Sequence, residues 1–418
     1  MALPASAPAA GPADGVPGAP EDLGDVLRRR LRQVPAAPLL FGRTATVQLD
    51  AEDEGIFRIE IVAGRATAHR GPARRQPTLV VTSSAQVLRA IAEGRESGVA
   101  AFLGHRITVR GDLSLALALD GLFTGEVAGP TCVAVAKPVR WPRAGLARPA
   151  GIPTAYLEAG PPDAPPVVLL HGLGGTNASM LPLLWELAVD HRVLAPDLPG
   201  FGASGKPRGL YDARWFARWL SAFLDELDVA RAVLVGNSMG GRVALEAGLW
   251  SPRAVAGLVL LAPAPAFRRL REWVPVARLV RPELAVMPLP LPHALVVEGM
   301  RSLFSDASRL PQAWYDAGAD EFLRVWRTRE GRVAFAACLR QIYLDEAYGE
   351  RGFWARLPAL APPALFVWGE RDRLVPVSFA RHAARALPGA HHVVLRDCGH
   401  VPQFEHPEEV AAMVRGFL

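Results

Sequence analysis

The strongest constraint on the fold is an alternation between apolar runs and amphipathic segments in the C-terminal part of this 418-residue chain. Nearly continuous apolar runs recur at residues 152–160, 165–172, 191–200, 232–237, 255–264, 363–372 and 390–400. Segments with a helical period, such as 211–229, lie between them. Strands that are apolar on both faces belong to parallel sheets with helices on each side. The pattern therefore predicts the α/β class, with a mostly parallel sheet within residues 152–418.

The alternation stops between about residues 265 and 356, where prolines and helix-like stretches replace it. A helical insertion at this point lies above the carboxyl ends of the strands, where open α/β folds bind their ligands. We interpret it as a helical lid. Its apolar side chains suggest a hydrophobic ligand: Trp273, Val274, Leu279, Met287, Leu289, Leu291 and Leu295.

Residues 22–130 follow a different pattern and are expected to form a small α+β domain. Alternation of apolar and polar residues, typical of half-buried strands, predicts strands at residues 44–50, 56–61, 78–82 and 106–110. Ser84 is placed to cap a helix over 85–94, and Asp112 to cap the very apolar helix 113–123.

Two further segments are expected to lie outside the domains. Residues 1–21 consist largely of alanine, proline and glycine, cannot bury a core, and are predicted to be a disordered tail. Residues 131–151 carry repeated prolines and glycines and are predicted to be the linker between the domains.

Charge and cysteine content narrow the location and the partners. The formal net charge is +5, and arginine-rich stretches such as 27–32 have the spacing of a solvated helix face, so we expect no nucleic-acid partner. The three cysteines lie far apart, which fits a reducing compartment and gives no metal-ligand pattern. The N-terminal stretch has no secretory signal pattern, and no apolar run is long enough to span a bilayer. These features predict a cytoplasmic protein without stable membrane insertion.

A serine surrounded by glycines follows the apolar run at 232–237. The stretch VGNSMGG places Ser238 between a predicted strand and a predicted helix, with Gly236 and Gly240 on either side. A G-x-S-x-G turn in this context presents a serine hydroxyl at a helix N-terminus, and the glycines let the helix pass close to the strand. The alternative is a tight turn with an incidental hydroxyl. We interpret Ser238 as a nucleophile.

A serine nucleophile needs a base, and the base needs an acid that orients it. In this type of fold the acid and then the histidine follow the serine along the chain. His400 stands at a turn after the last predicted strand, just before the last helix. Glu370 and Asp372 both follow the preceding strand. We favour Asp372 because it begins the loop proper, whereas Glu370 is expected to face solvent or Arg373.

The stretch HGLGG at residues 171–175 follows the run at 165–170. Acyl transfer needs N–H donors for a tetrahedral oxyanion, and this loop is where the fold supplies one of them. By position that donor is Leu173, and the second is Met239, the residue after the serine. The glycines lack the spacing of a dinucleotide loop and the lysine of a phosphate-binding loop. Acyl transfer of this kind needs no organic cofactor and no metal, and we expect neither.

Five motifs in a fixed order resemble those of the α/β-hydrolase family: HGLGG (171–175), DLPGFGASGKP (197–207), GNSMGG (236–241), WGERDRLVP (368–376) and DCGHVPQFEHP (397–407). The resemblance covers residues 152–418. It implies a serine hydrolase with Ser238, Asp372 and His400 as nucleophile, acid and base. Serine at the turn argues against the dehalogenase and epoxide-hydrolase branches, which need a carboxylate nucleophile.

GNSMGG and the segment 396–406 are also similar to the branch that cleaves carbon–carbon bonds in ring-fission products. That branch usually carries Ser-Gly-Pro-Gly after the first His-Gly, whereas this chain has Leu-Gly-Gly-Thr. The departure favours an ester as the scissile group.

The succession of strands, helix, strand and terminal apolar helix in the first domain resembles the sterol carrier protein 2 family. The Gly111-Asp112 step before the last helix is part of that resemblance. It implies an apolar tunnel that binds a lipid or an acyl chain. The alternative is a small α+β domain in which helix 113–123 is ordinary core.

These observations predict a lidded serine hydrolase, similar to carboxylesterases and lipases, joined to a lipid-binding domain. The expected substrate is a small hydrophobic ester, of an acyl lipid or a sterol-like compound, with a possible lipid ligand in the N-terminal domain. Two alternatives stay open: a carbon–carbon bond hydrolase, and a lipid-binding protein with an inactive hydrolase scaffold.

Overall fold

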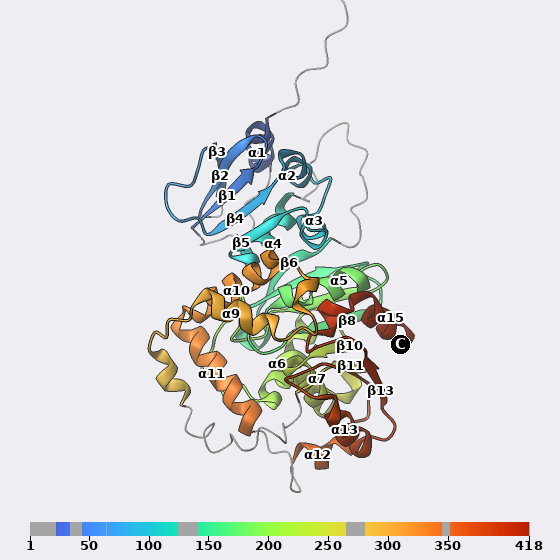
Figure 1. Cartoon of the computed structure of the whole chain (residues 1–418). Helices are drawn as coiled ribbons and strands as arrows, with labels where there is room; N and C mark the ends of the chain where they lie inside the picture. Colours follow the sequence, from blue (N-terminus) through green and yellow to red (C-terminus); the bar gives the residue numbers. More distant parts are fainter. Residues whose placement is uncertain are drawn as a thin grey trace, which may run out of the picture.

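The computed structural model describes residues 22–33, 44–63, 65–123, 141–264, 281–344 and 352–417. The predicted tail lies outside the described residues, as do residues 124–130 of the predicted first domain, 131–140 of the predicted linker, and 265–280 and 345–351 of the predicted lid. Figure 1 shows a smaller domain, coloured blue to cyan, above a larger one coloured green to red. The smaller domain contains a five-stranded sheet and the larger one an eight-stranded sheet.

The five-stranded sheet has the order β3-β2-β1-β4-β5, in which β1 and β4 are parallel and the other pairs antiparallel. Its strands are β1 (Ala45–Ala51), β2 (Gly55–Val62), β3 (Arg65–Arg70), β4 (Leu79–Ser83) and β5 (Thr108–Gly111). Its helices are α1 (Leu23–Gln33), α2 (Ala85–Ala92), α3 (Gly98–Leu103) and α4 (Leu113–Phe123). The four predicted strands are present. The sequence pattern misses β3, because this edge strand is mostly exposed and lacks an apolar face.

Both predicted helix caps are present in this domain. The Ser84 hydroxyl accepts a hydrogen bond from the Val87 N–H at 3.4 Å, and Asp112 Oδ1 accepts one from the Leu115 N–H at 2.9 Å. Gly111, just before Asp112, has a φ of +100°, and a Cβ there would lie 2.3 Å from the Thr78 carbonyl oxygen. Glycine is therefore required at the step from β5 into α4.

The eight-stranded sheet has the order β13-β12-β11-β10-β8-β9-β7-β6. Its strands are β6 (Arg143–Ala147), β7 (Thr154–Ala159), β8 (Pro166–Leu170), β9 (Arg192–Pro196), β10 (Ala232–Asn237), β11 (Val255–Leu261), β12 (Ala364–Gly369) and β13 (His391–Leu395). The pairs from β13 through β9 are parallel, and β7 pairs antiparallel with β9 and β6. The seven apolar runs therefore correspond to the seven strands from β7 to β13.

Strand β6 differs from the prediction, because it lies within residues 131–151, which were expected to be a linker. Its sequence Arg-Ala-Gly-Leu-Ala contains no β-branched residue, so the local pattern resembles a connection. The glycine has a tertiary reason: a Cβ on Gly145 would lie 2.2 Å from Tyr156 Cζ on β7. The close approach of that ring, and not a turn, explains the residue.

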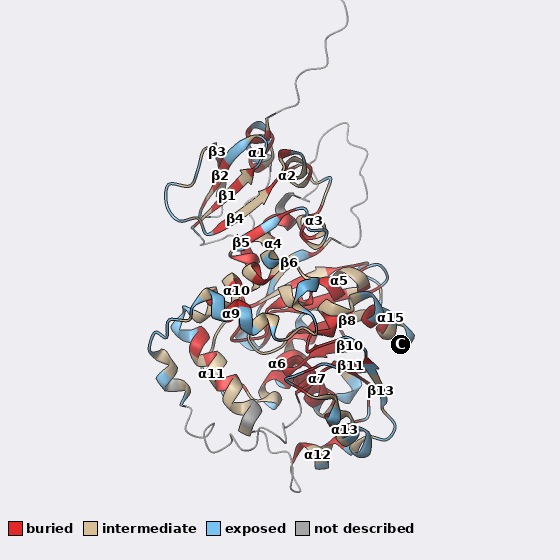
Figure 2. Ribbon diagram, in the orientation of Figure 1, coloured by how far each residue is buried: buried red, intermediate tan, exposed pale blue. Residues whose placement is uncertain are grey.

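Helices cover both faces of the eight-stranded sheet (Figure 1). They are α5 (Leu181–Leu187), α6 (Ala213–Glu226), α7 (Met239–Trp250), α12 (Phe353–Arg356), α13 (Ala380–Ala386), α14 (Pro402–Glu405) and α15 (Pro407–Phe417). On β10, Leu234 packs into the cluster that contains α6 and α7, whereas Val233 and Val235 pack into the cluster that contains α5 and α15. Figure 2 shows the central strands buried, which is the physical reason for their continuous apolar sequence.

The inserted segment between β11 and β12 is helical where the structure describes it. It contains the 3₁₀ turns η6 (Pro282–Val286) and η7 (Ala307–Arg309) and the helices α9 (His293–Arg301), α10 (Gln312–Trp326) and α11 (Arg329–Leu344). Met287, Leu289 and Leu295 are exposed. We refer to residues 281–344 as the lid. Among the described residues, no helix combines the length and the apolarity needed to cross a membrane.

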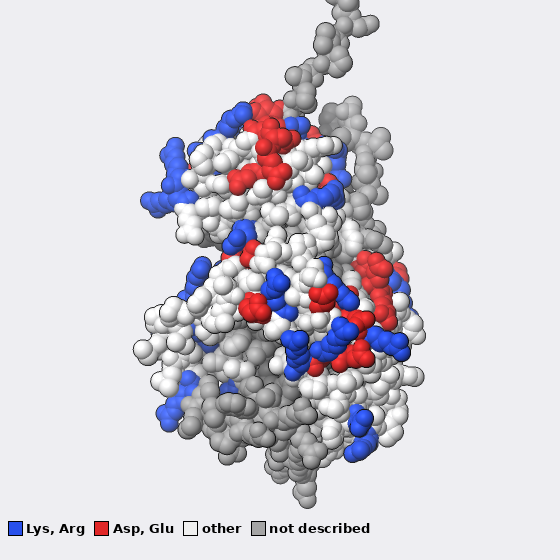
Figure 3. Space-filling model, in the orientation of Figure 1, with Lys and Arg blue, Asp and Glu red and all other residues white. Residues whose placement is uncertain are grey.

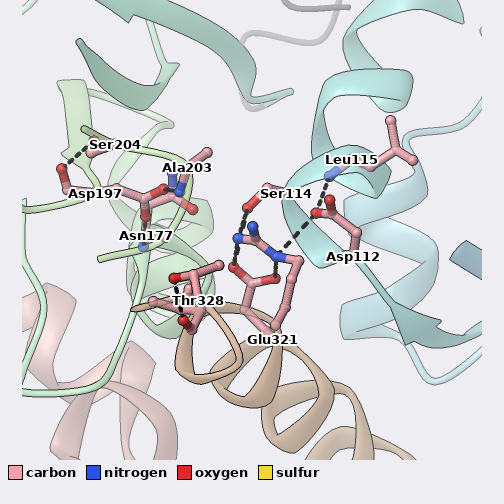
Figure 4. A network of polar contacts seen from close by, with 12 residues as sticks. Asp112, Ser114, Leu115, Asn177, Asp197, Ala203, Ser204, Glu321 and Thr328 are labelled. Atoms are coloured by element: carbon pink, nitrogen blue, oxygen red, sulfur yellow. Dashed lines mark hydrogen bonds and ion pairs between the residues drawn. The ribbon is translucent and has the colours of Figure 1, made fainter. Parts of the chain in front are cut away.

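Helix α10 of the lid is bonded to the N-terminal domain (Figure 4). The Ser114 hydroxyl donates to Glu321 Oε1 at 3.1 Å, and Arg324 contacts both Ser114 Oγ at 3.1 Å and Asp112 Oδ1 at 3.5 Å. Burial opposes the charge of Arg324, but its hydrogen bonds to Glu321 outweigh burial and raise the pKa of the guanidinium. A partly buried polar network therefore joins the two domains.

A second contact reinforces this junction. Arg110 donates to Asp320 Oδ2 at 2.7 Å, and the Gly111 N–H donates to the same oxygen at 3.0 Å. In Figure 3, basic and acidic side chains both occur on the visible face of each domain. The ion pairs Arg110–Asp320 and Arg324–Asp112 together hold α10 of the lid against the N-terminal domain at two neighbouring points.

A buried ion cluster ties α7 to α12 and, through Arg214, to α6, and we expect it to control acid stability. Glu246, 2% exposed, bonds to Arg242 at 2.9 Å and to Arg356 at 2.8 Å. Burial would raise the pKa of Glu246, but the arginines together lower it to about 2. The folded-state pKa is below the unfolded value, so this stabilisation is present above pH 4.5 and is lost as the pH falls towards 2.

Glu246→Gln should therefore lower the free energy of unfolding at pH 7 by about 3 kcal/mol. The difference from the wild type should shrink at pH 3, as measured by urea denaturation at both pH values. Glu298→Gln, on an exposed part of α9, is the control and should change little. A difference for Glu246→Gln that is the same at both pH values would contradict this account.

Candidate active site

Ser238 lies at the sharp turn between β10 and α7. Its backbone has φ 53° and ψ −114°, a conformation that costs a non-glycine residue of order 1–3 kcal/mol. Three backbone hydrogen bonds hold it there. The Ser238 N–H donates to the Leu261 carbonyl at 2.9 Å, and the Ser238 carbonyl accepts from Arg242 at 3.1 Å and Ala264 at 2.9 Å. The surrounding sheet and helix therefore impose the strain on this one residue.

The flanking glycines are required by the close passage of the helix over the strands. A Cβ on Gly236 would lie 2.4 Å from the Gly240 carbonyl carbon. A Cβ on Gly240 would lie 2.1 Å from the Leu170 carbonyl oxygen on β8. In both cases the atom that would be contacted belongs to the backbone and cannot move away. The spacing of the glycines therefore follows from the geometry of the turn.

His400 and Asp372 are brought together by the loops after β13 and β12. His400 Nδ1 lies 2.8 Å from Asp372 Oδ2, and both side chains are buried. Asp372 Oδ1 accepts hydrogen bonds from the N–H groups of Leu374 and Val375, each at 2.8 Å. The carboxylate is thus fixed by its own loop while its second oxygen faces the imidazole. Glu370 is exposed and does not contact His400.

The histidine loop is also held by the lid. The backbone N–H of His400 donates to the Leu303 carbonyl at 2.7 Å, and a Cβ on Gly399 would lie 2.4 Å from that same oxygen. Glu405, in the last motif, accepts from the Gly399 N–H at 2.6 Å and from the Ser305 N–H at 2.8 Å. The lid and the loop therefore share one carboxylate, and the position of His400 depends on the lid.

Asn237, directly before the serine, connects the serine turn to the histidine loop. Its Nδ2 donates to the His400 carbonyl at 3.0 Å and to the Leu261 carbonyl at 3.2 Å. The side chain is 4% exposed. Sequence reasoning assigns no role to Asn237 beyond a family signature, since the contact spans 163 positions of the chain.

The HGLGG loop lies beside the serine. A Cβ on Gly172 would lie 3.4 Å from Ser238 Cβ. Leu173 lines the cavity in front of Ser238, and Met239 is the first residue of α7, so its N–H has no intrahelical acceptor. Both predicted donor residues are therefore next to the serine, one in the loop and one at the helix N-terminus.

His171 holds this loop in place through hydrogen bonds of both its ring nitrogens. Its Nε2 accepts a hydrogen bond from the Leu198 N–H at 2.9 Å, and its Nδ1 lies 2.8 Å from the Gly172 carbonyl oxygen. Complete burial lowers the pKa of His171 to about 4, so the ring is neutral at pH 7. An Nε2 that accepts requires the proton on Nδ1, which then donates to Gly172 and holds the loop.

Ser238 and His400 line the same cavity, which has a volume of about 470 Å³. Its wall is mostly apolar and comes from three parts of the chain. The hydrolase sheet and its loops supply the first part. The lid supplies the second, with residues such as Leu291 and Phe322, and the N-terminal domain supplies the third. The last includes Phe102 and Leu113, so the smaller domain forms part of the wall of this site.

Comparison with known proteins agrees with this architecture. A family model described as the alpha/beta hydrolase family matches residues 167–413. The chain belongs to the alpha/beta hydrolase family. A second model, the SCP-2 sterol transfer family, matches residues 27–124. Both predicted resemblances are therefore confirmed, and the protein is an alpha/beta hydrolase with an SCP2 domain before it.

Two relatives and one solved structure illustrate the range of proteins to which this chain is similar. A dihydrolipoyllysine-residue acetyltransferase component of an acetoin cleaving system from Pseudomonas putida is 33% identical over 63% of this chain and 66% of that protein. A 2-hydroxy-6-oxononadienedioate/2-hydroxy-6-oxononatrienedioate hydrolase from Cupriavidus pinatubonensis is 31% identical over 60% of this chain and 86% of that one. The solved structure of a bacterial membrane phospholipase A has a TM-score of 0.55 and 28% identity, covering 67% of this chain and 86% of that one.

Proposed function

We propose that this alpha/beta hydrolase cleaves a carboxylic ester of a hydrophobic substrate through an acyl-enzyme intermediate on Ser238. The observation that carries the proposal is the strained serine in an apolar cavity that it shares with a histidine bonded to a buried aspartate. A serine held at such a cost, beside a base that is oriented by an acid, has the parts needed for nucleophilic catalysis.

In the proposed mechanism Ser238 Oγ attacks the ester carbonyl while His400 Nε2 takes its proton. Asp372 keeps the other proton of the imidazole on Nδ1 and stabilises the imidazolium. The N–H groups of Leu173 and Met239 donate to the oxyanion of the tetrahedral intermediate. His400 then protonates the leaving alcohol, and the acyl group stays on Ser238. Water, deprotonated by His400, releases the acid and restores the serine.

The lining of the cavity supports a hydrophobic acyl group. The wall near the lid carries Leu291, Met300 and Phe322, and the wall near the sheet carries Leu173. The likeness to a phospholipase A adds support for a lipid ester. We also propose that the SCP2 domain binds a lipid or an acyl chain, because its apolar side chains form most of the wall of a second cavity, of about 90 Å³.

Carbon–carbon bond hydrolysis is the second candidate, and the Cupriavidus pinatubonensis relative is the reason to retain it. A direct comparison decides between the two reactions. The purified protein is given a series of p-nitrophenyl esters and, separately, a vinylogous 1,5-diketone of the ring-fission type. Ester hydrolysis should have the higher kcat/KM by at least tenfold. A diketone that is turned over faster than every ester would overturn the proposal.

The contact between Asn237 and the His400 carbonyl leads to a prediction about catalysis. Asn237→Ala should lower kcat by about 10- to 100-fold, because the histidine loop loses its bond to the serine turn and His400 shifts from its position. KM should change little, since the bond that is lost positions His400 and the apolar wall of the cavity is kept. Asn237→Asp keeps the volume but loses the donor, so it should lose as much activity as the alanine variant. An aspartate variant with wild-type kcat would mean that packing alone is needed at this position.

A further inference from the structure

The cavity of the SCP2 domain and the cavity in front of Ser238 are separated by a single layer of side chains. Phe102, Leu113 and Leu181 line both spaces. The first two belong to the SCP2 domain, and Leu181 begins α5 of the hydrolase domain. All three side chains are apolar, so a hydrocarbon chain that passed between them would meet no polar group that had to be desolvated.

The aromatic contact at this boundary comes from both domains. The rings of Phe102 and Trp314 stack with centroids 4.8 Å apart and planes 10° from parallel. Trp314 belongs to α10 of the lid, and its buried Nε1 has no hydrogen-bond partner among the described residues. The indole is thus held by ring contacts with Phe102, His105 and Phe404 and not by a polar bond. Its side chain can shift without breaking a hydrogen bond.

The polar contacts of the junction hold the two cavities facing each other. Arg110 with Asp320, and Ser114 with Glu321, join β5 and α4 to α10 on one side of this boundary. Because Glu321 also lines the cavity in front of Ser238, the junction is part of the wall of the site. The SCP2 domain is therefore positioned as a component of the hydrolase site.

The interior of the SCP2 cavity suits the end of an acyl chain. Apolar residues of β1, β2, β4, β5, α2 and α4 form most of its wall. Among the described residues that line it, Asp120 is the one ionisable group, and its carboxylate accepts hydrogen bonds from the Ser97 hydroxyl at 2.8 Å and the Gly98 N–H at 2.5 Å. Because both oxygens of Asp120 accept hydrogen bonds from the start of α3, the carboxylate presents no free polar group that would repel a methyl terminus.

We propose that the acyl chain of an ester bound at Ser238 passes between Phe102, Leu113 and Leu181 into the SCP2 cavity. The two domains then form one acyl site, and the SCP2 domain sets the chain length that the enzyme prefers. This inference rests on the ester hydrolysis proposed above. Each methylene that enters the cavity and is buried contributes about fourfold to kcat/KM.

Ala116→Phe tests the proposal. Ala116 lines the SCP2 cavity and not the cavity in front of Ser238, so a phenyl ring there fills the distal space alone. With p-nitrophenyl esters from acetate to palmitate, the ratio of kcat/KM for long chains to that for short chains should fall at least tenfold. Ala90→Phe, a buried position on α2 that lines neither cavity, is the matched control and should keep the wild-type ratio.

A binding measurement supplies a readout that does not depend on turnover by the variant. Wild-type protein is loaded with the fluorescent fatty acid cis-parinaric acid and then treated with ethyl or dodecyl fluorophosphonate. The dodecyl adduct at Ser238 should displace the fatty acid, whereas the ethyl adduct should not.

The outcomes separate the two proposals. Short esters hydrolysed at Ser238, with an unchanged chain-length ratio in folded Ala116→Phe, would overturn the shared site and leave ester hydrolysis standing. Fatty acid retained beside the dodecyl adduct would also overturn the shared site. A wild-type protein that hydrolyses no ester and forms no adduct would instead overturn the proposed function on which this inference depends.

Discussion

Replacing Ser238 by alanine is expected to lower kcat for ester hydrolysis by about 10⁵- to 10⁶-fold, the loss that follows removal of a serine nucleophile in enzymes of this type. The reason is chemical, because no other group replaces Oγ as the atom that attacks the carbonyl. Alanine meets the same backbone strain at φ 53° as serine, so the melting temperature should stay close to that of the wild type. Initial rates with a p-nitrophenyl ester and a thermal scan measure both quantities.

Ser302→Ala is the matched control for this variant. Ser302 lies at the exposed end of α9, where its hydroxyl donates to the Gly299 carbonyl at 2.6 Å, and it does not line the cavity in front of Ser238. Its rate should stay within about twofold of the wild type. A folded Ser238→Ala protein that retains more than a hundredth of the wild-type kcat would contradict a covalent mechanism at Ser238.

Replacing Asp372 by asparagine is expected to lower kcat by about 10⁴-fold through the tautomer of the histidine. The N–H groups of Leu374 and Val375 already point at one oxygen of this side chain, so they will hold the asparagine carbonyl oxygen in that place. The amide nitrogen then faces His400 Nδ1 and donates to it. The imidazole proton moves to Nε2. A protonated Nε2 can no longer accept the proton of the serine hydroxyl.

Glu370→Gln separates this explanation from a general loss of charge near the loop. Glu370 is the other carboxylate after β12, but it is exposed and its side chain contacts the Asp397 N–H at 3.5 Å. Its kcat should be within about threefold of the wild type. If Glu370→Gln loses as much activity as Asp372→Asn, the assignment of the acid is wrong.

Local patterns predict much of the hydrolase fold because its strands are buried on both faces. Continuous apolar runs, the G-x-S-x-G spacing around Ser238 and the caps at Ser84 and Asp112 can each be recognised within a few residues of the chain. The five predicted site residues meet in or beside one cavity because the ends of parallel strands collect at one edge of a sheet.

The features that the sequence did not predict depend on contacts between distant segments. Gly145 has the local pattern of a linker residue, and only the contact with the Tyr156 ring on the neighbouring strand explains it. The bond from Asn237 to the His400 carbonyl joins residues that no periodicity relates. The junction of Arg324 with Asp112 likewise depends on how one domain packs on the other. Strand and helix patterns describe burial along a segment and carry no information about which distant segment supplies the neighbour.

Covalent labelling with a fluorophosphonate tests the central claim most directly, because it reports the nucleophile without knowledge of the natural substrate. Intact mass and peptide mapping should find one adduct per chain, on Ser238, in the wild type and none in Ser238→Ala. His400→Ala should label at least a hundredfold more slowly, since the base that activates the serine is gone. An unlabelled wild type, or an adduct on a residue other than Ser238, would contradict acyl transfer at this serine.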